Sequence, residues 1–223
     1  MNLPSSKRAD IHPLTPDRWD DFVDLFGPDR GANSGCWCMW WRMPRADWRT
    51  VPRDEKRNRF HSVVEDGPPP GILAYDGGTA VGWCAVGPRA TLPRFSSSRI
   101  AAPLDDTERV FAVNCFYIRP GHRGVGMMRK LLDGAVKFAA DQGAKVIEAC
   151  PIETKRKLIW GEGYVGIASV FREAGFAEVA RRSPTRPLMR KRVRRRASQQ
   201  SARAPAGEPE RVQFAPAKET SER

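Results

Sequence analysis

A short loop at residues 118–128 carries the residue types that hold a phosphate, and it reads Ile-Arg-Pro-Gly-His-Arg-Gly-Val-Gly-Met-Met. Residues 109–118 are rich in β-branched and aromatic side chains, which predicts a mostly buried strand. Apolar residues after the loop recur at helical spacing until Gly143, which predicts a helix. Backbone N–H groups at a helix N-terminus favour negative charge, and Gly124 and Gly126 let a phosphate come close to the backbone. The loop therefore predicts a cradle for a diphosphate.

Two common phosphate-binding patterns do not fit this loop. It lacks a third glycine at the spacing of the dinucleotide fingerprint, and no Gly-Lys-Ser/Thr follows, as a P-loop requires. The loop instead resembles motif A of the GNAT acyltransferase family, Val-x-Pro-x-x-Arg-Gly-x-Gly-x-Gly/Ala, and departs from it at Met128. The matching residues, conservative at the first, are Ile118, Pro120, Arg123, Gly124 and Gly126.

The resemblance implies that backbone amides of the loop hold the pyrophosphate of acetyl-CoA, which is the expected cofactor. The larger side chain of Met128 should tighten the fit without removing a donor. The expected cofactor-binding residues are Ile118, Arg123, Gly124, Val125, Gly126, Met127 and Met128. Arg119 and Arg129 flank the loop and could also help to hold negative groups. A tight strand-to-helix turn without a ligand is the alternative interpretation.

A second resemblance lies at residues 171–176, Phe-Arg-Glu-Ala-Gly-Phe, which are similar to the family's Tyr-x-x-x-Gly-Phe at the end of its fourth helix. The two motifs occur in the expected order with a predicted strand between them. Together they imply an α/β (α+β) fold of the GNAT type, a mixed, largely antiparallel central sheet of six to seven strands flanked by about four helices. The expected domain covers residues 9–193, after an N-terminal extension at 1–8. Residues 194–223 are expected to be a basic, low-complexity, disordered tail.

The pattern of apolar residues, glycines and prolines predicts the elements of this domain. Strands are expected at residues 11–14, 71–75, 79–86, 109–118, 145–151, 177–182 and 187–193. Helices are expected at residues 16–25, from about 54 to 66, from the cradle to about 142, and at 166–174. Residues 28–53 and 87–107 are expected to be irregular.

The catalytic groups are harder to find. In the family that the chain resembles, transfer to an amine needs a base that takes a proton and an acid that protonates the leaving thiolate. The tyrosine that often serves as the acid is replaced by Phe171, which has no proton to give.

Tyr164, in the glycine-rich loop 161–166, is our first choice for the acid, and Glu148, in mid-strand, is our first choice for the base. Weaker candidates are Tyr117, Cys115 and Cys150 for the acid, Glu153 for the base, and Asn114 for orienting water or substrate. Alternatively, Tyr164 caps the edge of the core and Glu148 is a solvated or salt-bridged residue, so the sequence alone assigns neither role.

Residues 35–43 have the most unusual composition, Gly-Cys-Trp-Cys-Met-Trp-Trp-Arg-Met. Trp37, Trp40 and Trp41 could form an aromatic wall for an apolar or cationic acceptor, because indole faces attract cations and flat groups. The alternative is that they plug the end of the sheet. Cys36 and Cys38 form half a zinc site without a second ligand pair, so no metal is expected. A thiol nucleophile there would need a neighbouring base, which the sequence does not show.

The charge of +12 is unevenly distributed, since residues 181–196 hold nine Lys/Arg and no acid. No aromatic interleaving or recognition module accompanies this run, so nucleic acid is not the expected partner. No apolar run approaches the roughly 18 residues of a membrane span, and the N-terminus lacks a secretory core. The five cysteines suit reduced core thiols, so a cytoplasmic location is expected.

These patterns favour an acetyl-CoA-dependent N-acetyltransferase that acts on a primary amine of a small molecule. A protein or peptide acceptor drawn by the basic region is compatible with them, as is a homodimer. The main alternative is an acyl-CoA-binding sensor or docking module with little catalysis, which Phe171 would allow. A third hypothesis is that the basic tail is the functional part of the chain and binds nucleic acid.

Overall fold

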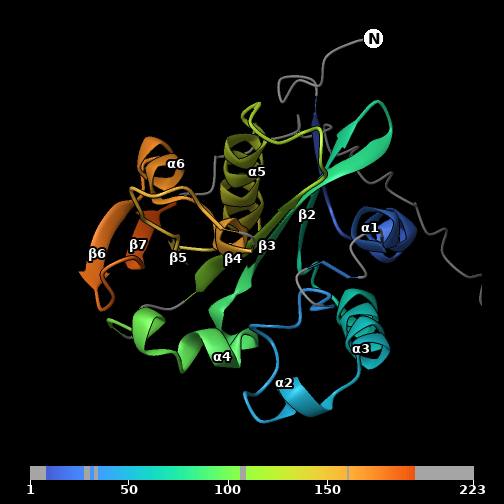
Figure 1. The fold of residues 1–223 in the computed structure, drawn as a ribbon, viewed down its shortest axis with the longest axis horizontal. Coiled ribbons are helices and arrows are strands. Elements are labelled where there is room, and N and C mark those ends of the chain that lie inside the picture. Colours follow the sequence, from blue (N-terminus) through green and yellow to red (C-terminus); the bar gives the residue numbers. More distant parts are fainter. Residues whose placement is uncertain (1–8, 28–30, 33–34, 106–108, 160, 194–223) are drawn as a thin grey trace, which may run out of the picture.

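The computed structural model describes residues 9–27, 31–32, 35–105, 109–159 and 161–193 (Figure 1). The expected N-terminal extension at residues 1–8 and the expected tail at residues 194–223 lie outside the described residues. Within the described ranges, no helix has the length and apolar character that crossing a membrane requires.

A seven-stranded sheet runs through the domain in the order β1-β2-β3-β4-β5-β7-β6 (Figure 1). Every neighbouring pair is antiparallel except β4 and β5, which run parallel. The strands are β1 (Asp10–Pro13), β2 (Gly71–Asp76), β3 (Thr79–Pro88), β4 (Val110–Ile118), β5 (Val146–Ala149), β6 (Ala177–Arg181) and β7 (Pro187–Arg192). The expected mixed, largely antiparallel sheet is confirmed.

Four helices lie where the sequence pattern predicts them: α1 (Trp19–Phe26), α3 (Arg53–Asp66), α5 (Met127–Asp141) and α6 (Ala168–Glu173). The regions expected to be irregular also contain short helical segments, which are α2 (Asp47–Thr50), η4 (Arg89–Thr91), α4 (Pro93–Ser96) and η5 (Arg99–Ala101). Two further 3-10 turns are η2 (Pro16–Arg18) and η6 (Glu162–Val165). Segments of about one turn are too short to show a helical period, so the sequence pattern does not predict them.

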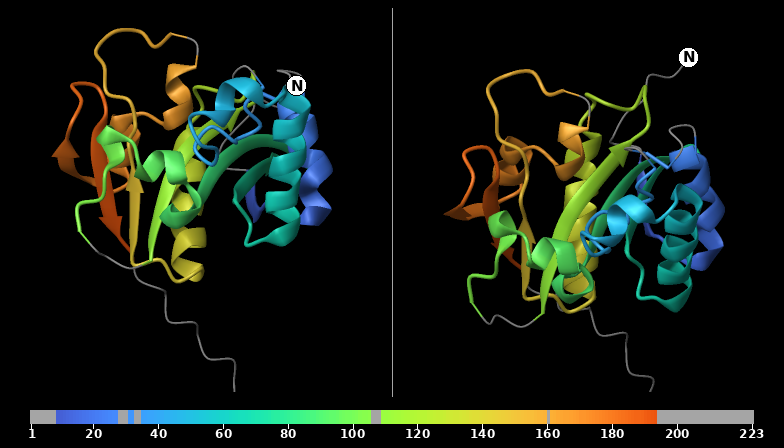
Figure 2. Two further views of the ribbon diagram at one scale, coloured as in Figure 1. Left: turned by 90° about the horizontal axis from the view of Figure 1, so that it is seen from below. Right: turned by 60° about the horizontal axis from the view of Figure 1, so that its bottom comes forward.

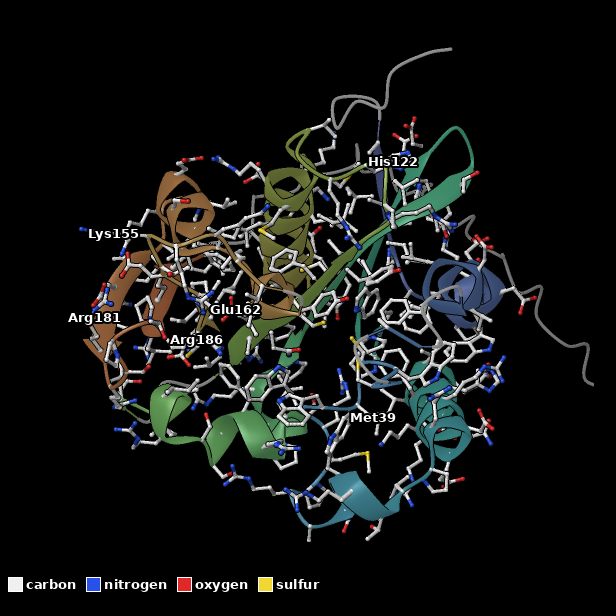
Figure 3. The ribbon with its side chains drawn as sticks, viewed as in Figure 1. Met39, His122, Lys155, Glu162, Arg181 and Arg186 are labelled. Atoms are coloured by element: carbon white, nitrogen blue, oxygen red, sulfur yellow. The ribbon has the colours of Figure 1, made fainter. Side chains whose placement is uncertain are left out.

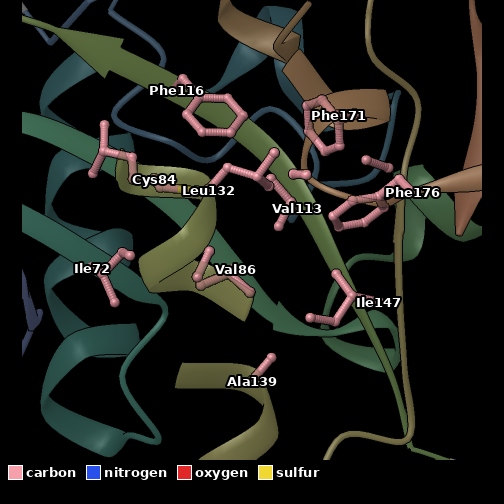
Figure 4. Close-up of a cluster of buried hydrophobic side chains, with 14 of the residues drawn as sticks. Ile72, Cys84, Val86, Val113, Phe116, Leu132, Ala139, Ile147, Phe171 and Phe176 are labelled. Carbon is pink, nitrogen blue, oxygen red and sulfur yellow. The ribbon is translucent and has the colours of Figure 1, made fainter. Parts of the chain in front are cut away.

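The helices cover both faces of the sheet, with α5 and α6 on one face and α1 and α3 on the other (Figures 1 and 2). Successive side chains of a strand point to opposite faces. Accordingly Cys84 of β3 packs in the cluster with α5, whereas Trp83 packs in the cluster with α1 and α3. Figure 4 shows the first cluster, where Leu132 of α5 lies near Phe116 and Phe171. The first cluster fixes α5 against the end of β4, since Met127 and Leu131 pack there with Phe116.

The sheet opens between β4 and β5. The two strands pair only over residues 110–112 and 146–148, while β4 continues beside β3 to Ile118. A β-bulge lies in β4, because Ala85 and Val86 of β3 pair with residues 115 and 113. Asn114 is therefore the extra residue of the bulged strand. Past the bulge, the β5 side of β4 is free of a strand partner within the described residues, and the loop that contains η6 approaches it there.

Candidate functional site

The predicted cradle joins the end of β4 to the start of α5. Gly124 and Gly126 have φ angles of 75° and 84°, in the left-handed region that favours glycine. A Cβ added at Gly124 would meet nothing within 4 Å, so the backbone there is open to a ligand. Among the described residues, no side chain caps the start of α5, and its first turn contains no acidic residue. The N–H groups of that turn therefore remain available to an anion.

The three arginines around the cradle have different surroundings. Arg123 folds back on the end of β4, where its Nε donates to a backbone carbonyl at 2.7 Å. Arg129 binds the carboxylate of Asp133 one turn along α5, with Nε 3.0 Å from each oxygen. Arg119 is tied to α1, since its Nη2 lies 2.6 Å from the Asp24 carboxylate. Arg123 and Arg129 line the cavity beside the cradle, and Arg119 does not.

A cavity of about 590 Å³, here named the cradle cavity, opens beside this loop. Six of the seven expected cofactor residues line it, namely Ile118, Arg123, Gly124, Gly126, Met127 and Met128. Val125 is the exception, because it is 37% exposed and is not among the lining residues. The opposite wall comes from the loop before α6 and from α6 itself, and includes Leu158, Ile159, Gly161, Gly163, Tyr164, Ile167 and Val170.

A second cavity of about 270 Å³, here named the tryptophan cavity, also borders Tyr164. It is lined by Phe26, Ala32, Cys36, Cys38, Trp40, Trp41, Asn114, Cys115, Tyr117, Gly161, Tyr164, Val165 and Arg186. The two cavities share Gly161 and Tyr164. The ring of Tyr164 stacks on that of Tyr117, with 6.1 Å between the centroids and 23° between the planes. Tyr164 therefore stands at the boundary between the cradle cavity and the tryptophan cavity.

The three tryptophans predicted for the acceptor do not share one environment. Trp40 and Trp41 line the tryptophan cavity, and the Trp41 Nε1 group donates to the carbonyl of Asn114 at 3.0 Å. That bond ties the indole to the bulge of β4. Trp37 is only 5% exposed and packs on Phe22 and Phe26 of α1 at 6.2 and 6.1 Å. Trp37 is not in the cavity lining and belongs to the buried cluster with α1 and α3.

Glu148 is not brought to this site. It is 1% exposed, and its carboxylate lies between two guanidinium groups. Arg89 binds one oxygen, and Arg190 binds the other with Nη2 at 2.6 Å. Glu148 and both arginines line a separate cavity of about 400 Å³ that contains neither Tyr164 nor a cradle residue. Glu148 is thus a salt-bridged residue, which is the alternative that the sequence left open. Its position does not support the expected role as the base.

Three cysteines line the tryptophan cavity, and Cys38 has a distinct environment among them. Burial alone would raise the pKa of the Cys38 thiol, but hydrogen bonds from Cys115 and Trp83 outweigh it and leave the pKa lowered. The Trp83 Nε1 group donates to the Cys38 sulfur at 2.8 Å, and the charge of Arg42 acts in the same direction. Burial raises the pKa of Cys36 to about 12. Among the described residues, no group of three or more His, Cys, Asp or Glu side chains could hold a metal ion.

Arg186 was not singled out by the sequence, where it forms part of the basic run after residue 180. It lies in the connection between β6 and β7 (Figure 3) and lines the tryptophan cavity. Its isolation between Thr185 and Pro187, away from the dense charges at 190–196, is the one sequence signal that separates it from the rest of the run.

Comparison with known proteins identifies the class. A family model described as the acetyltransferase (GNAT) family matches residues 34–157. This match spans more than half of the chain, and the chain belongs to that family. The resemblance expected from motif A is thereby confirmed. No curated protein matches the sequence.

Solved structures show the same fold. One is yncA of Salmonella typhimurium, described as an acetyltransferase and solved with its cofactor acetyl-CoA. It is 15% identical, with a TM-score of 0.50 over 86% of this chain and 97% of that one. Another is described as an acetyltransferase of Acinetobacter baylyi, 12% identical, with a TM-score of 0.50 over 83% and 93% of the two chains. At these identities the likeness concerns the fold alone.

Proposed function

We propose that this chain uses acetyl-CoA to acetylate a primary amine of a small molecule. The observation that carries the proposal is the meeting of two cavities at Tyr164, one beside an anion cradle and one walled by tryptophans. Membership of the acetyltransferase family supports acetyl transfer, and the similar structure yncA was solved with acetyl-CoA. The tryptophan cavity, at about 270 Å³, has room for a small acceptor.

The cradle fits the diphosphate of acetyl-CoA. An uncapped helix start, two glycines with left-handed φ angles and the guanidinium of Arg123 together favour a group of negative charge. We assign cofactor binding to Ile118, Arg123, Gly124, Gly126, Met127 and Met128, with Val125 taking part through its backbone alone. Acetyl-CoA supplies a thioester, which is the activated form of the acetyl group.

Tyr164 is the proposed proton donor to the leaving thiolate, because its side chain borders both cavities. Phe171, at the position where the family often has a tyrosine, is fully buried against Phe116 and Phe176 (Figure 4). Trp40 and Trp41 are proposed to hold the acceptor. Glu148 has no part in this proposal, because two arginines bind its carboxylate in another cavity.

The test is an assay of the full-length protein with acetyl-CoA and a panel of small amines, read by mass spectrometry of the acceptor. Acetylation of a small amine that requires Tyr164 would support the proposal. Tight binding of acetyl-CoA without acetylation of any amine would favour the sensor alternative, which the buried Phe171 makes worth testing. Acetylation of peptides alone would favour a protein acceptor. A homodimer and a cytoplasmic location stay predictions from the sequence.

A further inference from the structure

The tryptophan cavity has a lining of unusual charge. Arg186 is the one charged side chain among the described residues that line it, and Asp, Glu and Lys are absent from that set. The other lining side chains are aromatic rings, thiols, an amide and small aliphatic groups. A cationic amine without a negative group would therefore meet a positive charge and no carboxylate in this part of the chain.

The guanidinium of Arg186 is only partly used by the protein. Its Nε and Nη2 groups both donate to the carbonyl of Cys150, at 2.8 and 2.6 Å. A guanidinium has five N–H donors in a fixed plane, so the edge that includes Nη1 is left over. Within the described residues, Arg186 forms no ion pair, and burial lowers its pKa. A half-buried charge without a counterion is unfavourable unless a ligand supplies one.

Two more guanidinium groups lie next to the cavity lining. Arg42 is close to Cys38, and Arg94 stacks on the Trp40 ring with its Cζ 3.6 Å from the centroid. Burial lowers the pKa of both arginines. Neither forms an ion pair with a described carboxylate, and the Nη1 group of Arg94 is buried without a hydrogen-bond partner. Neither arginine lines the cavity, so among the described residues Arg186 is the charged group that an acceptor in the cavity would meet directly.

Elsewhere the fold does neutralise a buried arginine. Arg89 and Arg190 share the buried carboxylate of Glu148, and Arg190 also binds Asp105 at 2.7 Å. The two groups of arginines therefore differ in how the fold treats their charge. One group is paired within the protein, and the group around the tryptophan cavity is not.

We propose that the amine acceptor also carries a carboxylate, and that the free edge of Arg186 binds it. This inference rests on the proposed acetyl transfer and names the class of substrate. A carboxylate can take two parallel hydrogen bonds from a guanidinium edge, which fixes its orientation as well as its charge. The positive site disfavours the cationic acceptor that the tryptophans alone would allow.

The rest of the acceptor should be apolar or aromatic and about as large as one amino acid. The cavity holds about 270 Å³, and aromatic side chains form much of its wall, including Trp40, Trp41 and Tyr117. Ligand cavities for larger molecules usually exceed roughly 300 Å³. An apolar amino acid or an aminobenzoate has the required amine, carboxylate and size.

The test compares acceptors that differ only in the carboxylate. The full-length protein with saturating acetyl-CoA is assayed with apolar and aromatic amino acids, with their carboxamides and with the corresponding amines that lack the acid group. Aminobenzoates are compared with their amides in the same way. We expect at least one acid to exceed its carboxamide by at least about tenfold in kcat/KM, since loss of a charged hydrogen bond has effects of that size.

Variants assign the effect to Arg186. Arg186→Gln should raise KM for the acid and remove the preference over the carboxamide, while the affinity for acetyl-CoA stays unchanged. Arg186→Lys should restore only part of the preference, because lysine keeps the charge and loses the planar fork. Arg182→Gln is the matched control, since Arg182 is close in sequence but binds the carbonyl of Ala102 and does not line the cavity.

The outcomes separate this inference from the proposed function. Equal acetylation of acids and carboxamides, or an Arg186→Gln variant that keeps the preference, would overturn the inference and leave acetyl transfer standing. A preference for polyamines or lysine side chains would also overturn it. If no amine is acetylated, the proposed function fails. Calorimetry then measures whether the acetyl-CoA-loaded protein binds the same acids more tightly than their carboxamides, which tests the Arg186 site by itself. Equal affinities for acids and carboxamides would overturn the inference as well.

Discussion

The rings of Tyr164 and Tyr117 stack with 6.1 Å between their centroids, at the wall shared by the cradle cavity and the tryptophan cavity. Tyr117 belongs to β4 and Tyr164 to η6, so the stack joins the opened edge of the sheet to the loop before α6. This contact holds the proposed proton donor where a thioester in one cavity would meet an amine in the other.

Tyr164→Phe should therefore lower kcat by about 10²- to 10⁴-fold, the usual contribution of a positioned acid. The ring and its stacking remain, so the affinity for acetyl-CoA should change little. Steady-state kinetics and calorimetry measure the two quantities. Tyr75→Phe is the matched control, because it removes a hydroxyl that binds Asp21 at 2.7 Å, away from both cavities. Equal kcat for Tyr164→Phe and wild type would show that Tyr164 is not the acid.

Glu148→Gln should reduce stability rather than chemistry. Removing the carboxylate leaves the largely buried side chains of Arg89 and Arg190 without their shared partner, and breaking such a buried pair lowers the free energy of unfolding by about 3–5 kcal/mol. Urea denaturation gives this quantity, and kcat of the folded enzyme should stay near the wild-type value. Glu55→Gln, which disrupts an exposed pair with Arg59, should change stability little. A large loss of kcat at unchanged stability would restore Glu148 as the base.

Cys38 should be the first cysteine to react with a small alkylating reagent. Its pKa is lowered, so its thiolate persists to a lower pH than that of an ordinary thiol, and its reaction rate should fall only below that pKa. Burial raises the pKa of Cys36 and of Cys150 to about 12, so both should react slowly at pH 8. Iodoacetamide labelling followed by peptide mapping across pH measures this order. Fast labelling that survives in Cys38→Ser would assign it to another thiol.

The tryptophans should separate into two classes. Trp40→Ala should raise KM for the acceptor, because the Trp40 ring lines the cavity and is 38% exposed. Trp37→Ala should instead lower the free energy of unfolding by about 3–5 kcal/mol, since a buried indole packed on α1 is lost. Acceptor kinetics and urea denaturation of both variants test the division. A raised acceptor KM for Trp37→Ala, at unchanged stability, would contradict it.

Local patterns in the sequence predict most of this fold. The bounds of the seven strands agree with expectation to within two residues at each end, because alternating apolar residues and turn glycines are local signals. The cradle was also predictable, since Gly124, Gly126 and the start of α5 are adjacent in sequence. Val125 shows the limit of such a motif, because the pattern does not say which side chain of the loop faces the ligand.

Long-range contacts account for what the sequence could not predict. Glu148 has apolar neighbours in the chain, but its partners Arg89 and Arg190 are 59 and 42 residues away. Trp37 and Trp40 stand three residues apart, but Trp37 packs in the core and Trp40 lines the cavity. Trp37 and Cys38 have left-handed φ angles, a backbone conformation that their residue types do not announce. Arg186 is one of many arginines until the β6–β7 connection brings it to the tryptophan cavity.

The binding of acetyl-CoA by the cradle is tested most directly by calorimetry on two glycine variants of the full chain. Gly121 and Gly124 both have left-handed φ angles and open space around the added Cβ, but only Gly124 lines the cradle cavity. Glutamate at either position therefore brings similar backbone strain and the same charge. We predict saturable binding of acetyl-CoA by the wild type and by Gly121→Glu, and its loss in Gly124→Glu. Unchanged binding by Gly124→Glu, or no binding by the folded wild type, would contradict the account.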